Sequence, residues 1–268
     1  LNVLIGALKH SPELAKANVL AHSVCLGNAN NSLLHALVAA WDEIDQANIV
    51  SFLNEYRMKA GFPSVDHQQV HVALKDLEKL HARSAAVGVW TLDHPGEAMD
   101  RIVAVELVRH SSGSFLEQFV RNYDTLSEPD LACINEEIDK VILDAENANA
   151  DLGALVTKAS DLLVQWDNVN QPVQVYEQHQ GHEEGRSKRI YEKLRLLCLD
   201  LANNRNEFSE AQRLSKALLR TFPELESVAE VLKGDLEQLE TLNEQQKLHQ
   251  KYKGLIDACE AAKTQLPT

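Results

Sequence analysis

The sequence predicts an all-α protein, built as an irregular multi-helix bundle or as a superhelical array of antiparallel helical hairpins. Apolar residues recur at helical spacing along most of the chain. Only 14 of the 268 residues are aromatic, whereas leucine, alanine and valine are abundant. This balance favours packed helices over β-sandwiches, whose strands draw on β-branched and aromatic residues. No credible strand is longer than four residues.

The N-terminal region, residues 1–126, reads as a series of short helices. Ser11 is placed to cap the first of them, Pro12 suits its first position, and Gly27 suits its end. Short breaks rich in Gly, Pro, Ser or Asp separate the helices that follow. These helices are expected over 30–44, 47–61, 66–90, 97–109 and 114–125.

The C-terminal region, residues 127–268, is expected to begin with a new helix at Ser127-Glu128-Pro129. A second helix covers 150–167. Pro172 is then expected to interrupt the helical path, so that a short separate helix follows it and ends at Gly181.

Residues 207–223, EFSEAQRLSKALLRTFP, resemble the second helix of a tetratricopeptide unit, with Phe208 and Ala211 near its start and Pro223 at its end. The preceding LRLLCLDLANNRN could form the first helix of this hairpin. No second copy at a period of about 34 residues is evident, so a regular array is not supported. A long terminal helix over 224–264 follows, which a break near Gly254 could interrupt.

The net charge of −14 opposes binding to nucleic acid and to anionic membrane surfaces. No run of 18 apolar residues and no signal-peptide pattern is present, so we expect a cytoplasmic protein without membrane contact. The four cysteines lie 61 or more residues apart and predict buried free thiols. Because the sequence starts with Leu1 and not methionine, we expect it to be part of a longer protein.

Three segments together resemble the helical region of certain bacterial J-domain proteins: ALKHSPELAKANVLAHSVCLGNAN, WDNVNQPVQ, and LRLLCLDLANNRNEFSEAQRLSKALLRTFPEL. The similarity spans most of the chain. In that family a His-Pro-Asp motif in a separate J domain stimulates an ATP-dependent chaperone. The nearest string here, His94-Pro95-Gly96, lacks the acidic residue. The resemblance therefore implies an accessory region without the J domain itself.

His179, His182, Glu183 and Glu184 are the densest group of potential metal ligands in the sequence. A metal-dependent module is one interpretation of this group. The alternative is a polar loop, made flexible by Gly181 and the glycine at 185, whose two glutamates favour the start of the next helix through its dipole.

Residues 186–220 hold nine Lys or Arg and four Asp or Glu, a basic stretch within an acidic protein. It is either a docking face for an acidic or nucleic-acid partner, or a face neutralised by acidic helices of the same chain such as 224–244. Few aromatic residues that could stack on bases lie nearby, only Tyr176 and Tyr191, so nucleic acid is not expected.

No phosphate loop, nucleophile elbow or dinucleotide motif appears in the sequence. We therefore expect a non-catalytic protein-interaction or scaffolding module that uses no cofactor, metal or small-molecule substrate. Its partner is expected to be another protein. The candidate residues for partner binding are His179, His182, Arg186, Lys188, Arg189 and Lys193.

Overall fold

The computed structural model describes residues 11–109, 114–147, 149–223 and 225–264. Within these residues the chain forms ten α-helices and no strand, which confirms the all-α prediction. The helices are α2 (Pro12–Cys25), α3 (Asn31–Asp42), α4 (Gln46–Lys59), α5 (His67–Trp90), α6 (Pro95–Arg109), α7 (Ser114–Ala145), α8 (Leu152–His179), α9 (Gly185–Asn203), α10 (Phe208–Thr221) and α11 (Glu226–Thr264). No helix in the described ranges is long and apolar enough to cross a membrane.

Local sequence signals account for many of the helix ends. The Ser11 hydroxyl accepts a hydrogen bond from the backbone N–H of Leu14 at 3.2 Å, as expected for an N-cap. Asp66 and Gln69 form a capping box at the start of α5. Gly27 follows α2 with a φ of +82°, a conformation that glycine adopts without strain.

The chain divides into two compact units. The first comprises Leu1–Ala132 and Asn168–His182, and the second comprises Cys133–Asp167 and Glu183–Thr268. The predicted boundary between residues 126 and 127 lies inside α7.

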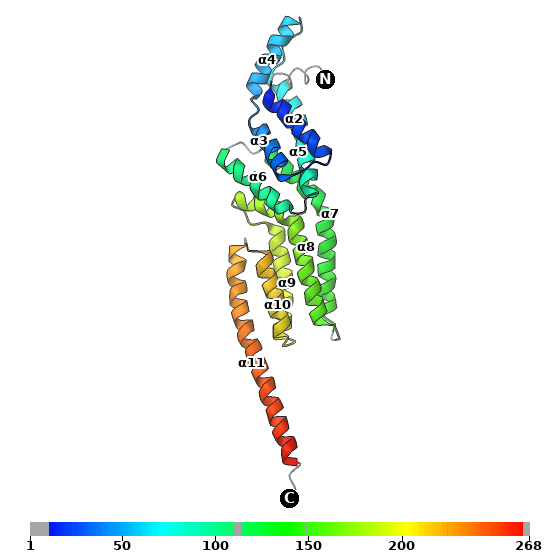
Figure 1. The fold of residues 1–268 in the computed structure, drawn as a ribbon, viewed down its shortest axis with the longest axis vertical. Helices are drawn as coiled ribbons and strands as arrows, with labels where there is room; N and C mark the ends of the chain where they lie inside the picture. Colours follow the sequence, from blue (N-terminus) through cyan, green and yellow to red (C-terminus); the bar gives the residue numbers. More distant parts are fainter. Residues whose placement is uncertain (1–10, 110–113, 148, 224, 265–268) are drawn as a thin grey trace. The chain divides into compact units, whose positions relative to one another are not determined.

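In the first unit, α2, α3, α5 and α6 pack against one another around an alanine-rich core (Figure 1). The beginning of α7 adds Phe115, Phe119 and Tyr123 to this core. Small side chains on α5, such as Ala82 and Ala85, let neighbouring helices approach closely while still burying apolar surface.

Two predicted helix breaks do not occur. α7 runs through Pro129 and α8 runs through Pro172, so the predicted helix start at Ser127 and the predicted interruption at Pro172 are wrong. A proline inside a helix costs about 3 kcal/mol. Burial on both sides of each proline offsets that cost, since Tyr123 and Leu131 flank Pro129, and Trp166 and Val173 flank Pro172.

In the second unit, α10 packs against both α9 and α11 (Figure 1). The hairpin predicted from the tetratricopeptide-like segment is present, and Ala211 is fully buried within it. Asn206, with a φ of +59°, lies in the turn between its two helices. The terminal helix is continuous through Gly254, so no break occurs there.

The prediction of buried free thiols holds only in part. Cys25, Cys133 and Cys198 are free thiols, but only Cys198 is buried, and burial raises its pKa to about 12. The prediction of burial is wrong for Cys25 and Cys133, because apolar neighbours in sequence do not decide which face of a helix a residue occupies. The side chain of Cys259 lies outside the described residues.

Replacing Gly88 or Gly234 with alanine is expected to change the stability of the protein in opposite directions. A Cβ at Gly88 would lie 2.6 Å from Val24 Cγ1, whereas nothing lies within 4 Å of a Cβ at Gly234. Gly88→Ala is therefore expected to destabilise by about 1–2 kcal/mol, since overpacking outweighs the better helix propensity of alanine. Gly234→Ala should stabilise by about 0.5–1 kcal/mol. Urea denaturation followed by far-UV circular dichroism measures both, and a stabilising Gly88→Ala would contradict the packing.

Candidate functional site

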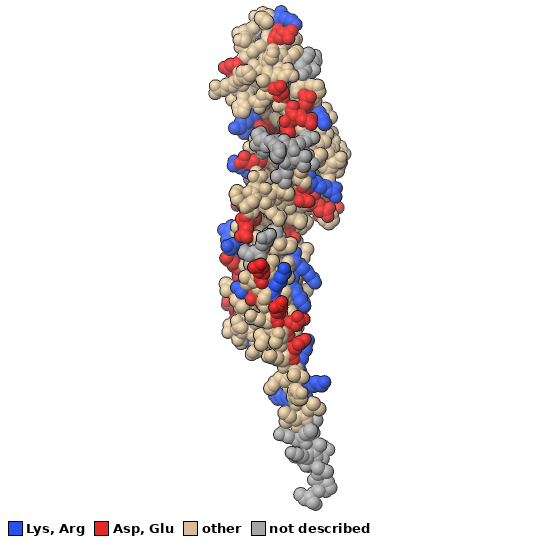
Figure 2. Space-filling view, turned by 90° about the vertical axis from the view of Figure 1, so that its left-hand side faces the viewer, with Lys and Arg blue, Asp and Glu red and all other residues tan. Residues whose placement is uncertain are grey.

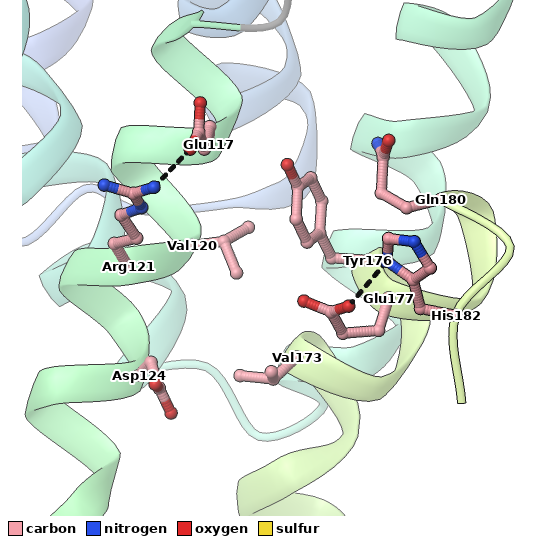
Figure 3. Close-up of a pocket in the computed structure, with 9 residues that line it drawn as sticks. All are labelled: Glu117, Val120, Arg121, Asp124, Val173, Tyr176, Glu177, Gln180 and His182. Carbon is pink, nitrogen blue, oxygen red and sulfur yellow. Dashed lines mark hydrogen bonds and ion pairs between the residues drawn. The ribbon is translucent and has the colours of Figure 1, made fainter. Parts of the chain in front are cut away.

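A groove of about 300 Å³ lies between α7 and α8 in the first unit (Figure 3). Both helices contribute apolar side chains to it, Val120 from α7 and Val173 and Tyr176 from α8. The remaining lining residues are polar or charged, and they are Glu117, Arg121, Asp124, Glu177, Gln180 and His182. The groove thus combines an apolar surface with a charged rim.

Core packing and one long-range hydrogen bond hold the two walls of the groove in place. The Tyr123 hydroxyl donates to the backbone carbonyl of Val169 at 2.9 Å, which ties α7 to α8. Pro172 has no N–H and cannot donate to the carbonyl of residue 168, which is next to the Val169 carbonyl that accepts from Tyr123. Burial raises the pKa of the Tyr123 hydroxyl, with a smaller contribution from the Asp130 carboxylate, and this keeps the hydroxyl protonated as a donor.

Two polar side-chain contacts lie at the rim of the groove, one within each wall. Arg121 Nη2 lies 2.5 Å from Glu117 Oε1 on α7, and His182 Nδ1 lies 3.3 Å from Glu177 Oε2 after the end of α8 (Figure 3). The lining residues include three carboxylates and one guanidinium, a formal charge of −2 when His182 is neutral. The rim is therefore acidic.

The two histidines predicted as partner-binding residues belong to the first unit. His182 lies at the rim of the groove, so the structure brings it together with Val173 and Tyr176. His179 is the last residue of α8, and its Nε2 lies 3.6 Å from Asp100 Oδ1 on α6. Gly181, with a φ of +77°, turns the chain after α8 as its sequence predicted.

The four predicted cations belong to the second unit, on α9. Arg186 Nε is 3.0 Å from Glu184 Oε1, and Lys193 Nζ is 2.7 Å from Asp139 Oδ1 on α7. Lys188 and Arg189 are exposed, and no ion pair among the described residues involves either of them. Half of the predicted basic set is thus paired within the chain.

Other contacts of the basic stretch agree with internal neutralisation. Arg195 donates two hydrogen bonds to Asp235 on α11, at 2.8 and 3.3 Å. Asp235 lies within the acidic segment 224–244 that the sequence offered as a neutralising partner. Part of the basic stretch is therefore paired with acidic residues of the same chain.

Glu184 has a structural role that the sequence anticipated. Its carboxylate accepts hydrogen bonds from the backbone N–H groups of Arg186 and Ser187, which makes it the N-cap of α9. Burial raises the pKa of Glu184, but the hydrogen bonds from Arg186 and Ser187 outweigh burial and leave this pKa lowered. Across the described residues, no group of three or more His, Cys, Asp or Glu side chains is placed to hold a metal ion.

Most of the groove could not be predicted from the sequence. Val173 and Tyr176 share a helix face at i and i+3, but this spacing is equally typical of a packed core. The partners from α7 lie more than 45 residues earlier in the chain, and no motif links them to α8. Comparison of the chain with protein-family models, with curated proteins and with solved structures finds no match.

Proposed function

We propose that this chain is a protein-interaction module, the accessory region of a J-domain co-chaperone, and that the groove between α7 and α8 receives a side chain of its partner. The single observation that carries the proposal is the groove itself. It is an apolar surface with a charged rim, held between two helices that are fixed by the buried core. The sequence resemblance described above supports the co-chaperone context.

The chemistry of the groove selects a basic partner segment. Val120, Val173 and Tyr176 can cover the aliphatic stem of a lysine or arginine side chain. The Tyr176 ring can also attract the cationic head group, and the acidic rim complements its charge. The partner is therefore a peptide segment with a lysine or arginine next to an apolar residue.

Panning a phage-displayed library of random linear peptides on the chain tests this function. The selected peptides should share a lysine or arginine beside an apolar residue. Their affinity, measured by fluorescence anisotropy, should fall about tenfold or more in Gln180→Trp, since the indole fills the groove. Gln178→Trp is the matched control, because Gln178 is exposed two residues earlier, in the last turn of α8, but does not line the groove.

Both substitutions replace exposed residues near the end of α8, so circular dichroism should show unchanged helicity. If no peptide is enriched, or if Gln180→Trp binds the selected peptides as tightly as Gln178→Trp does, the groove is not the docking site. The coding sequence that flanks this chain tests the co-chaperone context separately. A J domain with His-Pro-Asp there supports it, and the absence of one in the full reading frame removes it.

A further inference from the structure

The second half of α11 extends past the helices that cover its first half (Figure 1). Up to Ile256, where the described side chains of α11 end, Asn243 is the last buried residue. Three residues later, Gln246 Nε2 donates a hydrogen bond to the backbone carbonyl of Asn206, in the turn between α9 and α10, at 2.9 Å. From Lys247 to Ile256, every side chain is exposed.

This exposed stretch carries an apolar stripe. Leu248, Tyr252 and Leu255 are spaced by 4 and 3 residues, which places them on one face of the helix. They are 53%, 58% and 54% exposed, and Ile256 beside them is 57% exposed. Scattered single apolar residues on a surface are normal, but a continuous stripe at heptad spacing is the pattern of a helix that pairs with another helix.

The exposed stretch is positively charged. It holds Lys247, Lys251 and Lys253, and no carboxylate occurs from residue 245 to residue 256. At about 100° per residue, Lys251 lies directly beside the stripe, whereas Lys253 lies on the opposite face of the helix. The protein as a whole carries −14, so this local sign is opposite to the average. Figure 2 shows the same pattern, with lysine and arginine side chains but no acidic ones on the last described part of α11 before the grey residues.

We propose that residues 247–256 of α11 form a second docking surface, and that its occupant is an acidic amphipathic helix of a partner protein. Leucines of such a helix would cover Leu248, Tyr252 and Leu255. Its glutamates or aspartates would lie beside Lys251, at a flanking position where charge decides the choice of partner. This inference does not depend on the groove of the first unit.

A second copy of the chain fits this surface less well. Residues 247–256 of two paired copies carry six lysines and no carboxylate, and the lysine beside each stripe is Lys251. In the antiparallel register that places Leu248 opposite Leu255, the two copies of Lys251 lie side by side. Like charges across such a contact disfavour it, whereas an acidic partner relieves the repulsion.

Binding of a synthetic helical peptide tests the proposal. The probe has leucine at heptad positions a and d and glutamate at e and g, and it carries a fluorescein label. Anisotropy should show binding that weakens as NaCl is raised. Leu248→Ser and Lys251→Glu should each weaken it about tenfold. The controls Val231→Ser and Lys233→Glu, exposed on the first half of α11, should leave it unchanged.

A second peptide, with lysine in place of the glutamates, should bind wild type poorly and should bind Lys251→Glu better. Circular dichroism should show that all variants keep their helicity, since every changed residue is exposed. The proposal is overturned if the acidic peptide does not bind, or if the stripe variants and the controls bind it equally.

Two further results would show that something other than an acidic helix binds this surface. Sedimentation equilibrium should show a monomer, and a dimer abolished by Leu248→Ser would identify a second copy as the occupant. Vesicles of phosphatidylcholine and phosphatidylserine should not retain the protein. Retention that Leu248→Ser and Lys251→Glu abolish would show that the surface binds anionic lipid.

Discussion

Replacing Trp166 with alanine is expected to lower the free energy of unfolding by about 3–5 kcal/mol. Trp166 is 1% exposed, and its ring meets the fully buried Phe222 edge to face with centroids 5.6 Å apart. The substitution removes the largest buried side chain of the second unit and leaves a cavity. Because domains are commonly stable by only about 5–15 kcal/mol, this loss is a large part of the total.

Urea denaturation monitored by far-UV circular dichroism measures the effect. Tyr252→Ala serves as the control, since Tyr252 is an aromatic residue of the same unit that is 58% exposed. Its effect should stay within about 0.5 kcal/mol. Equal destabilisation by the two substitutions would show that Trp166 does not occupy the core position in which the structure places it.

The sequence predicted those features whose causes are local. Ser11, Asp66 and Gly27 act on the backbone within a few residues of themselves, so their pattern is sufficient to locate helix ends. Helical periodicity predicted the fold class for the same reason.

The prolines show where local reasoning fails. The sequence predicted a new helix start at Ser127-Glu128-Pro129 and an interruption at Pro172, but both helices run through their prolines. Whether the helix continues depends on how much surface its two halves bury against distant segments. Tyr123 and Val169, which are 46 residues apart, illustrate that long-range term.

The groove shows that local sequence patterns are also insufficient to predict a functional site. Its walls come from two helices, and no motif in the sequence links them. The composition of the sequence showed the basic stretch, but it did not show which acidic residues pair with it. Lys193 with Asp139 and Arg195 with Asp235 are pairs that only the tertiary structure can identify. Composition predicts that a charge exists, whereas packing decides whether it is available to a partner.

Acidification should weaken the first unit through His81, by about 3 kcal/mol between pH 6.5 and pH 4. His81 is 3% exposed, and burial lowers its pKa from 6.5 to about 4. The Trp41 Nε1–H donates a hydrogen bond to His81 Nδ1 at 3.2 Å, so this nitrogen must stay unprotonated. Trp41 also stacks on Phe115 with centroids 5.6 Å apart, which places the pair within the core.

The direction of the effect follows from proton binding. The unfolded chain binds a proton on His81 near pH 6.5, whereas the folded chain binds one only near pH 4. Between these values the unfolded state holds more protons, so the free energy of unfolding falls as the pH falls. Asp167 acts in the opposite sense, because burial raises its pKa to about 6 and its neutral form is favoured in the folded state.

The His81→Gln variant separates these contributions. Its side-chain carbonyl can still accept the Trp41 hydrogen bond but does not titrate, while Asp167 is left unchanged. Urea denaturation at pH 7 and at pH 4.5 should show a steeper loss of stability in wild type than in the variant. Equal losses in both proteins would mean that His81 is accessible to protons in the folded state, and that burial does not hold it neutral. A steeper loss in the wild type would instead show that the Trp41–His81 contact makes the core of the first unit sensitive to acid.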